Sequence, residues 1–134
     1  MTEAEILRRY RTIAVVGLSN DPRRDSHSVS QYMQAAGYRI IPVNPEETEV
    51  LGEKAYPDLA SVPEPVEIVD IFRRPEYIPA IVDQAIAIGA KVIWMQQGIV
   101  NETAAATARA AGLEVVMNSC IRTVRQRMEM DGGR

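Results

Sequence analysis

The sequence predicts an α/β fold in which a doubly wound, mainly parallel five-stranded sheet has helices on both faces. Short apolar runs alternate with helical stretches along the 134 residues, as in successive βα units with right-handed crossovers. The apolar runs are nearly continuous, as expected for strands that helices cover on both sides. Gly37, Gly89 and Gly112 each separate a helical stretch from the next apolar run. Glycine is favoured at this position because many helices end with a residue in the left-handed conformation. This punctuation repeats three times and supports a Rossmann-like arrangement.

The expected strands are runs rich in β-branched and apolar residues. They cover residues 12–17, 38–44, 66–72, 90–96 and 113–118. A helix over 3–10 precedes the first strand, and further helices are expected over about 26–36, 75–88, 101–111 and 119–129. The length fits one domain over residues 1–134.

The segment 45–65 is the irregular part, because it contains four prolines. We expect only a short extra edge strand near Lys54–Ala55 and a helical turn near 57–61. The tail 130–134 is expected to be frayed.

Composition and charge exclude several function classes. A net charge of -3 gives no reason to expect nucleic acid or an anionic membrane surface as a partner. No apolar run approaches the ~20 residues of a transmembrane helix, and the charged first ten residues lack the apolar stretch of a signal peptide. The single Cys120 cannot form an internal disulfide. A cytoplasmic location is therefore expected.

A ligand site is expected at the carboxyl ends of the strands, because open α/β sheets bind ligands there, at the point where the strand order reverses. Polar and turn residues follow each strand: GLSNDPRRDSHS, then VNP, RRP, QQGI and NSC. The basic residues are almost all arginine, with Lys54 and Lys91 as the exceptions. This bias reflects either genomic base composition or forked contacts to phosphate oxygens.

The loop after the first strand has the layout of a phosphate-binding loop, with one difference. Only Gly17 is present, whereas the dinucleotide motif GxGxxG has three glycines. Ser26 fits a helix N-cap or first-turn position, and a helix that begins there directs its N–H groups and dipole toward an anion. Arg23 and Arg24 stand beside it. A solvated loop with an ordinary serine cap explains the same residues equally well.

The second strand disfavours NAD. An NAD site has an Asp or Glu about 20 residues after the glycine loop, which binds the ribose diol. Here the strand ends in Asn44-Pro45, and the next acids, Glu46 and Glu47, follow the proline. Arg39 lies at the wrong end of this strand to contact a 2′-phosphate.

Taken together, these loops resemble the CoA-binding protein family, the single-domain relatives of the CoA-binding domain in the succinyl-CoA synthetase alpha subunit. The similar motifs extend from about residue 10 to 128, and the first has Pro22, Arg24, Ser26 and Val29 in matching spacing. The motifs are GLSNDPRRDSHSVSQYM, GYRIIPVNP, VEIVDIFRRPE, AIAIGAKVIWMQQGIVNE and AGLEVVMNSC.

The resemblance implies that coenzyme A, or an acyl-CoA, binds at the strand ends. The first loop would meet the phosphates, the second would border the adenosine, the third would line the adjoining wall and the fourth would lie near the pantetheine arm. The cofactor-binding residues expected from the loops and the resemblance are Gly17, Ser19, Arg23, Arg24, Ser26, Asn44, Pro45, Phe72, Arg73, Arg74, Pro75, Gln96, Gln97 and Gly98.

Two features depart from this family. The last strand is followed by Asn118-Ser119-Cys120, where the family commonly has Asp-Arg-Cys, and this puts a role for that corner in doubt. The sequence also does not contain the second domain that carries the phosphorylated histidine in the synthetase. His27, the only histidine, matches no such role.

No catalytic or metal site is evident, and we expect a CoA-binding protein without catalytic machinery. Acid–base or nucleophilic catalysis needs a positioned pair. Asp70 is interpreted as a structural carboxylate within a strand, with a shifted pKa at a site as the alternative. Cys120 either exchanges disulfides with CoA or, as is more common, is inert. One Cys and one His cannot build a closed zinc site.

The alternatives to this function are a nucleotide-dependent oxidoreductase and a CoA-ligase component that needs a partner chain. The sequence leaves open whether the chain forms a homo-oligomer or binds a partner protein.

Overall fold

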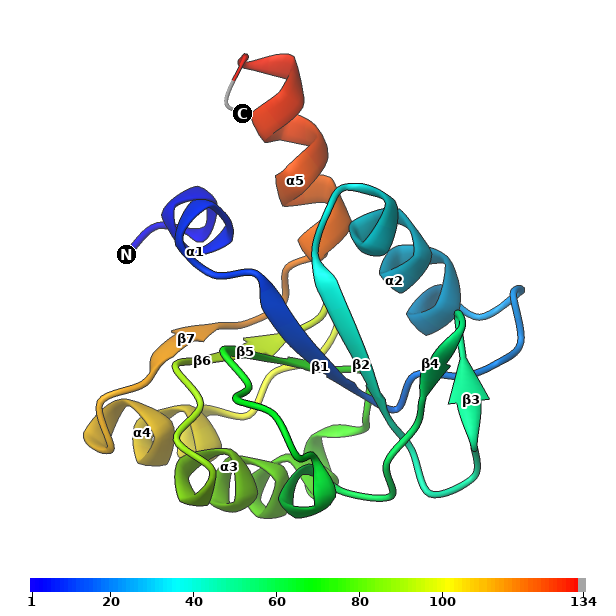
Figure 1. The fold of residues 1–134 in the computed structure, drawn as a ribbon. Helices are drawn as coiled ribbons and strands as arrows, with labels where there is room; N and C mark the ends of the chain where they lie inside the picture. Colours follow the sequence, from blue (N-terminus) through cyan, green and yellow to red (C-terminus); the bar gives the residue numbers. More distant parts are fainter. Residues whose placement is uncertain (133–134) are drawn as a thin grey trace.

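A five-stranded sheet forms the centre of the protein in the computed structural model, which describes residues 1–132 (Figure 1). All neighbouring strands are parallel, and their order is β2-β1-β5-β6-β7. The predicted doubly wound, Rossmann-like α/β fold is confirmed. The strands are β1 (Thr12–Val16), β2 (Arg39–Val43), β5 (Ile68–Ile71), β6 (Val92–Met95) and β7 (Glu114–Val116).

Helices cover both faces of this sheet, as the continuous apolar runs predict. Three helices lie on one face and two on the other (Figure 1). The first group is α1 (Glu3–Arg9), α2 (Asp25–Ala35) and α5 (Ile121–Met130), and the second is α3 (Ile78–Ala87) and α4 (Glu102–Ala110). The helix expected over 75–88 begins as a separate 3-10 turn, η2 (Pro75–Tyr77).

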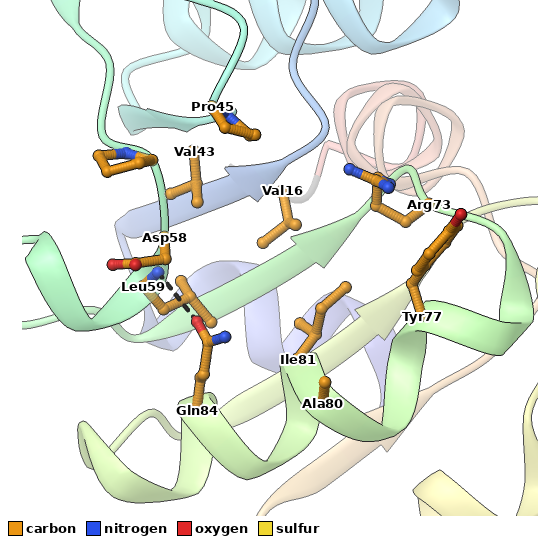
Figure 2. Close-up of a pocket in the computed structure, with 11 residues that line it drawn as sticks. Val16, Val43, Pro45, Asp58, Leu59, Arg73, Tyr77, Ala80, Ile81 and Gln84 are labelled. Atoms are coloured by element: carbon orange, nitrogen blue, oxygen red, sulfur yellow. Dashed lines mark hydrogen bonds between the residues drawn. The ribbon is translucent and has the colours of Figure 1, made fainter.

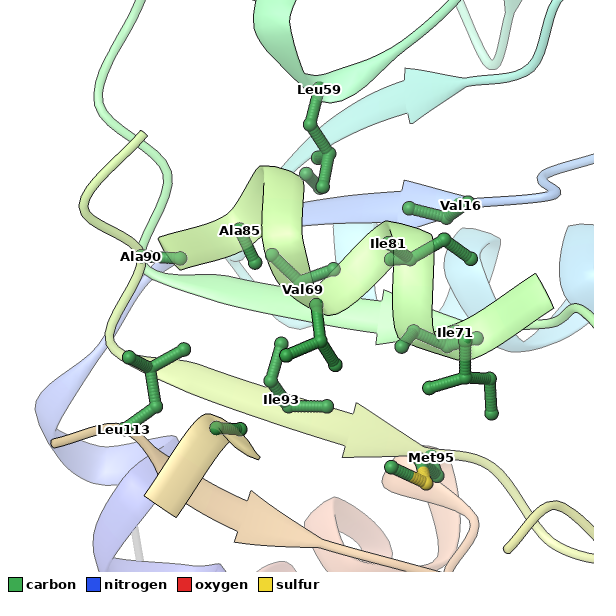
Figure 3. Close-up of a cluster of buried hydrophobic side chains, with 14 of the residues drawn as sticks. Val16, Leu59, Val69, Ile71, Ile81, Ala85, Ala90, Ile93, Met95 and Leu113 are labelled. Carbon is green, nitrogen blue, oxygen red and sulfur yellow. The ribbon is translucent and has the colours of Figure 1, made fainter. Parts of the chain in front are cut away.

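Alternate residues of each strand pack into two separate apolar layers. Val69 and Ile71 of β5 lie with Ile93 and Met95 of β6 against α3 and α4 (Figure 3). The residues between them in sequence, such as Trp94, face α1, α2 and α5. Because each strand is apolar on both sides, a shift by one residue would expose neither layer, and the loops at the strand ends must help to set the register.

The irregular segment after β2 contains a small hairpin. The strands β3 (Glu49–Val50) and β4 (Glu53–Lys54) are antiparallel, and the two turn residues between them, Leu51 and Gly52, both have positive φ, as a tight hairpin turn requires. The expected edge strand near Lys54–Ala55 is therefore half of a hairpin, and only Tyr56 bridges to Val43 of β2. The expected helical turn is η1 (Leu59–Ser61).

The last helix starts and ends slightly later than its expected range. Cys120 is its N-cap, and Met130 still belongs to it. The expected frayed tail begins at this residue, and residues 133–134 lie outside the described part of the chain. Over residues 1–132, none of the helices has the length and apolar character to cross a bilayer.

Candidate functional site

The strand order reverses between β1 and β5, so the carboxyl ends of these two strands frame the crevice where open α/β sheets bind ligands. Gly17 follows β1, and its N–H donates to the Val43 carbonyl at 2.8 Å. Phe72 follows β5, and its N–H donates to the Val16 carbonyl at 2.9 Å. These bonds extend the parallel ladders past the strand ends and fix where both loops begin.

Gly17 is the point at which these two loops pack against each other. Its φ is +92°, and a Cβ at this position would lie 2.7 Å from the Phe72 carbonyl oxygen and 3.0 Å from Cδ of Arg73. Both the backbone conformation and the close approach favour glycine. The single glycine of the first loop therefore lets the β5 loop pass beside it and places the Arg73 side chain next to the crevice.

The loop from β1 to α2 is held by its own polar side chains. Ser26 Oγ accepts from the Ser19 N–H at 3.1 Å, and Ser19 Oγ accepts from the Asp21 N–H at 3.0 Å. Nδ1 of the buried His27 lies 2.9 Å from the Ser19 carbonyl oxygen. Ser26 is thus a first-turn residue whose side chain shapes the loop, and Arg24 is the N-cap, without a side-chain capping bond.

The two adjacent arginines of this loop have different surroundings. Nε and Nη2 of Arg23 each lie 3.1 Å from one carboxylate oxygen of Asp21, and the Arg23 side chain is 89% exposed. These bonds hold the pKa of Asp21 below its usual range. In contrast, the Arg24 guanidinium makes no ion pair within residues 1–132. Its charge is therefore available at the start of α2.

Residues after β2 connect their loop to the first loop. Asn44 Nδ2 donates to the Leu18 carbonyl at 3.0 Å, and its Oδ1 accepts from the Glu46 N–H at 2.9 Å. Glu47 Oε2 accepts from the Asn20 N–H at 2.8 Å. This role of Glu47 was not predicted from the sequence, because no local pattern signals a contact between residues so far apart in the chain. A carboxylate here occupies a backbone donor of the candidate phosphate loop.

One pocket lies on the α3 side of the crevice, beside the ends of β1 and β2, and we call it the α3 pocket (Figure 2). It has a volume of about 220 Å³. Most of its lining is apolar, and few polar groups reach it. The lining residues are Val16, Val43, Pro45, Pro57, Asp58, Leu59, Arg73, Tyr77, Ala80, Ile81 and Gln84.

Arg73 and Tyr77 form one wall of the α3 pocket (Figure 2). The Arg73 guanidinium carbon lies 4.5 Å from the centre of the Tyr77 ring, a cation–π distance. Arg74 instead donates through Nη2 to the Tyr77 hydroxyl at 3.2 Å and is exposed. Pro75 begins η2, and its carbonyl accepts from Asn101 Nδ2 at 3.0 Å. Of the predicted RRP residues, Arg73 alone lines the α3 pocket.

A second pocket of about 150 Å³, the α5 pocket, lies where β5 and β6 end beside α2 and α5. Phe72 lines it, whereas the next residue, Arg73, lines the α3 pocket, so the β5 loop separates the two. Gln96 and Gln97, two of the expected cofactor-binding residues, line the α5 pocket. The other lining residues are Asp25, Val29, Ile99, Cys120 and Arg122.

The corner that departs from the family pattern has a structural role. Asn118 has a φ of +55°, and its Oδ1 accepts from the Gly98 N–H at 2.7 Å. The Ser119 carbonyl accepts from Nε1 of the buried Trp94 at 2.9 Å. The Asn118 side chain therefore fixes the loop after β6, and Gly98 lies at this joint, outside the residues that line the α5 pocket.

Asp70 lies beneath the α5 pocket and is only 2% exposed. Gln96 Nε2 donates to its Oδ1, and the Ile121 N–H donates to Gln96 Oε1 at 3.4 Å. Burial raises the pKa of Asp70 to about 7, although the hydrogen bond from Gln96 acts in the opposite direction. Gln96 separates this carboxyl group from the pocket and ties it to the first turn of α5.

The class of protein follows from a family model that matches most of the chain. This model is described as a CoA binding domain and matches residues 11–126. The chain belongs to this family of CoA-binding domains, as its motifs predict.

Two relatives of similar length match most of the chain. Uncharacterized protein YneT of Bacillus subtilis (strain 168) is 48% identical over 118 residues, which are 88% of this chain and 87% of that protein. A solved structure of a hypothetical protein from Pyrococcus horikoshii OT3 has a TM-score of 0.92 at 41% identity, covering 96% of this chain and 93% of the other.

A larger relative contains a similar segment. The alpha subunit of acetate–CoA ligase [ADP-forming] II from Pyrococcus furiosus is 39% identical over 62 residues. These residues are 46% of this chain and only 14% of that subunit.

Proposed function

We propose that this protein binds coenzyme A, or an acyl-CoA, across the carboxyl ends of β1 and β5. The observation that carries the proposal is the pairing of two pockets on either side of one crevice, beside Arg24 and Arg73, which have no ion-pair partner among residues 1–132. Coenzyme A is an extended molecule with a flat base at one end, three phosphate groups and a long arm. An extended ligand of this kind matches a divided site.

The α3 pocket fits the adenosine end. Its mostly apolar walls suit a flat base, and a few polar groups are enough to orient it. Pro45 and the Arg73–Tyr77 wall form its rim (Figure 2). Gln84 Oε1 already accepts from the Leu59 N–H at 3.2 Å, so its amide group is fixed and its Nε2 donors remain to contact a base.

The phosphates would lie between the pockets. Arg24 and Arg73 present guanidinium groups, which bind phosphate oxygens through forked hydrogen bonds. The α2 N-terminus adds unpaired N–H groups and a favourable dipole. Arg23 contributes less in this proposal, because Asp21 already neutralises it.

The pantetheine arm would enter the α5 pocket past Phe72 and reach Gln96, Gln97 and Cys120. We assign no reaction to this pocket. His27 is bound to a loop carbonyl and Asp70 is bound to Gln96, so a structural contact accounts for each of these two groups. Cys120 lies at the N-cap position of α5 without a side-chain capping bond, and no histidine that could act as its base is among the residues that line this pocket.

A second candidate function is a CoA-ligase component that acts with a partner chain. The similarity to the acetate–CoA ligase alpha subunit favours it, although that similarity covers only a small part of the subunit. In both proposals coenzyme A is the ligand, and they differ in whether another chain completes a reaction.

Isothermal titration calorimetry of the full chain with coenzyme A, NADP and ATP tests the proposal. We expect coenzyme A to bind most tightly, because only it has an arm for the α5 pocket. Adenosine 3′,5′-bisphosphate, which lacks the arm, should bind more weakly than coenzyme A. Clear binding of NADP with no heat from coenzyme A would overturn the proposal.

A further inference from the structure

Three arginines from separate parts of the chain meet at the edge of the sheet opposite the CoA site. Arg8 is in the last turn of α1, Arg11 directly precedes β1, and Arg125 is in α5. Arg11 stands at the amino end of β1, whereas the proposed CoA site lies at its carboxyl end. Because the strands are parallel, these are opposite ends of the whole sheet. These arginines line a small pocket of about 90 Å³, together with Leu7, Tyr38 and Met128. Helix α1 packs against α5 (Figure 1), and residues of both helices line the pocket.

The pocket is shaped by groups that cannot move freely. The Tyr38 hydroxyl is buried and donates to the Leu7 carbonyl at 2.6 Å, which ties the start of β2 to α1. The Arg11 guanidinium carbon lies 5.2 Å from the centre of the Tyr38 ring. The Arg125 side chain is only 14% exposed. One wall therefore holds a positive charge that is largely removed from water.

Arg125 has less polar compensation than its burial requires. Its Nη1 lies 3.2 Å from Glu129 Oε1 in an ion pair. This nitrogen is nevertheless buried, and no acceptor within residues 1–132 meets it in hydrogen-bond geometry. A buried donor without an acceptor costs free energy, and a bound ion can supply the acceptor that such a group lacks.

Three carboxylates lie near the pocket arginines, and each has a hydrogen-bond or ion-pair partner. Glu129 is the partner of Arg125, and its side chain is 50% exposed. Glu5 accepts from the Thr2 N–H at 2.7 Å in the cap of α1. Glu67 Oε1 accepts from the N–H groups of Arg11 and Thr12 at 2.8 and 3.0 Å. These carboxylates keep their charges, but none of them is among the residues that line the pocket, whereas three arginines are. The wall of the pocket itself is therefore positively charged.

We propose that Arg8, Arg11 and Arg125 form a second anion-binding site, which takes a small tetrahedral dianion such as inorganic phosphate or the phosphate of a small phosphomonoester. Several arginines around one small pocket offer forked donors that match the oxygens of such an ion. The pocket volume suits one phosphate group and is too small for a nucleotide. The site is separate from the proposed CoA site and does not depend on it.

NMR titration of the full chain with inorganic phosphate at constant ionic strength tests this site. Amide resonances around Arg11, Tyr38 and Arg125 should shift with phosphate and much less with acetate, which carries a single charge. A parallel titration with glycerol 3-phosphate distinguishes the free ion from a phosphomonoester. Equal shifts with acetate would show that the site does not select a dianion and would overturn the assignment.

Variants separate this site from the CoA site. Arg125→Gln should weaken phosphate binding at this pocket by about tenfold or more, the usual effect of losing a charged hydrogen bond. Arg8→Gln, at an exposed position, should also weaken it and serves if Arg125→Gln does not fold. Arg109→Gln on α4 is the matched control and should change nothing. Arg24→Ala should leave the shifts around Arg125 intact, and Arg125→Gln should leave coenzyme A affinity intact.

If phosphate shifts no resonance near Arg11 and Arg125, or if Arg8→Gln and Arg125→Gln leave the shifts unchanged, the proposal is wrong. Arg8 then only complements the dipole of α1, and Arg11 only stacks on Tyr38.

Discussion

The buried carboxyl group of Asp70 is held by the side-chain amide of Gln96, and the same amide accepts the Ile121 N–H at 3.4 Å. A group in the middle strand of the sheet is thereby connected to the first turn of α5. The α5 pocket lies directly above this connection. The protonation state of one carboxyl group can therefore affect both the stability of the sheet and the position of the helix that borders the pocket.

The first prediction concerns stability and pH. Burial raises the pKa of Asp70 to about 7, well above its ordinary value of 3.8. The folded state therefore binds a proton that the unfolded state has lost between these pH values. The contribution of protonated Asp70 to the free energy of unfolding is fully present below about pH 4. It is lost as the pH rises through about 7. Asp70→Asn, which keeps an acceptor for Gln96, should remove this loss.

Urea denaturation of both proteins from pH 4 to 8 measures this difference. Asp70→Asn should gain stability over the wild type as the pH rises, and the gain should level off above about pH 7. Asp21→Asn is the control, because the pKa of Asp21 is lowered from 3.8 and its stabilising contribution is lost only as the pH falls below about 4; its curve should run parallel to that of the wild type from pH 4 to 8. Parallel curves for Asp70→Asn and the wild type would show that Asp70 does not titrate in this way.

The second prediction concerns the close approach at Gly17. Gly17→Ala should destabilise the protein by ~1–2 kcal/mol for the left-handed backbone and by a further ~1–3 kcal/mol for the contact with the Phe72 carbonyl. Gly112→Ala is the matched control, because Gly112 has nearly the same φ, +91°, and nothing within 4 Å of the added Cβ. Urea denaturation of both variants separates the two costs. If Gly17→Ala and Gly112→Ala destabilised the protein equally, the β5 loop would have moved away from the added Cβ at little cost.

The third prediction concerns Glu47. Its carboxylate occupies the Asn20 N–H and places a negative charge in the loop proposed to meet the phosphates. Glu47→Gln should therefore raise the affinity for coenzyme A, by about 2–10-fold for one removed unfavourable charge. Glu46→Gln removes the same charge from the exposed neighbouring side chain and should have a smaller effect. Calorimetric titration measures both, and equal effects would assign the change to net charge alone.

The fold could be predicted from the sequence because its signals are local. Each apolar run is long enough to reveal a strand that is covered on both sides, and Gly37, Gly89 and Gly112 mark the joints between helices and strands. The hairpin β3–β4 could not be predicted, because its strands have two residues each and carry no periodicity. The helix bounds also differ from the expected ranges by one to three residues, and Ser26 takes the first-turn position, one of the two expected for it.

The candidate site was predictable only at the level of loops. Parallel strands bring all the carboxyl-end loops to one edge, so their residues could be placed there together. The direction of each side chain depends on contacts between distant segments. Nothing in the sequence distinguishes Arg23 from Arg24 as a phosphate ligand, but in the structure Asp21 pairs with Arg23. The contacts of Glu47 with Asn20 and of Gln96 with Asp70 likewise join separate segments and have no sequence pattern.

The affinity of coenzyme A for Arg24→Ala, compared with Arg23→Ala, tests the proposed site most directly. The two variants remove the same charge from neighbouring positions, but Arg23 pairs with Asp21, whereas Arg24 has no ion-pair partner in the described part of the chain, residues 1–132. We predict that Arg24→Ala weakens binding by ~1–3 kcal/mol, the range for a lost charged hydrogen bond, and that Arg23→Ala weakens it clearly less. Unchanged affinity in Arg24→Ala, measured by calorimetry, would contradict a phosphate site at the start of α2.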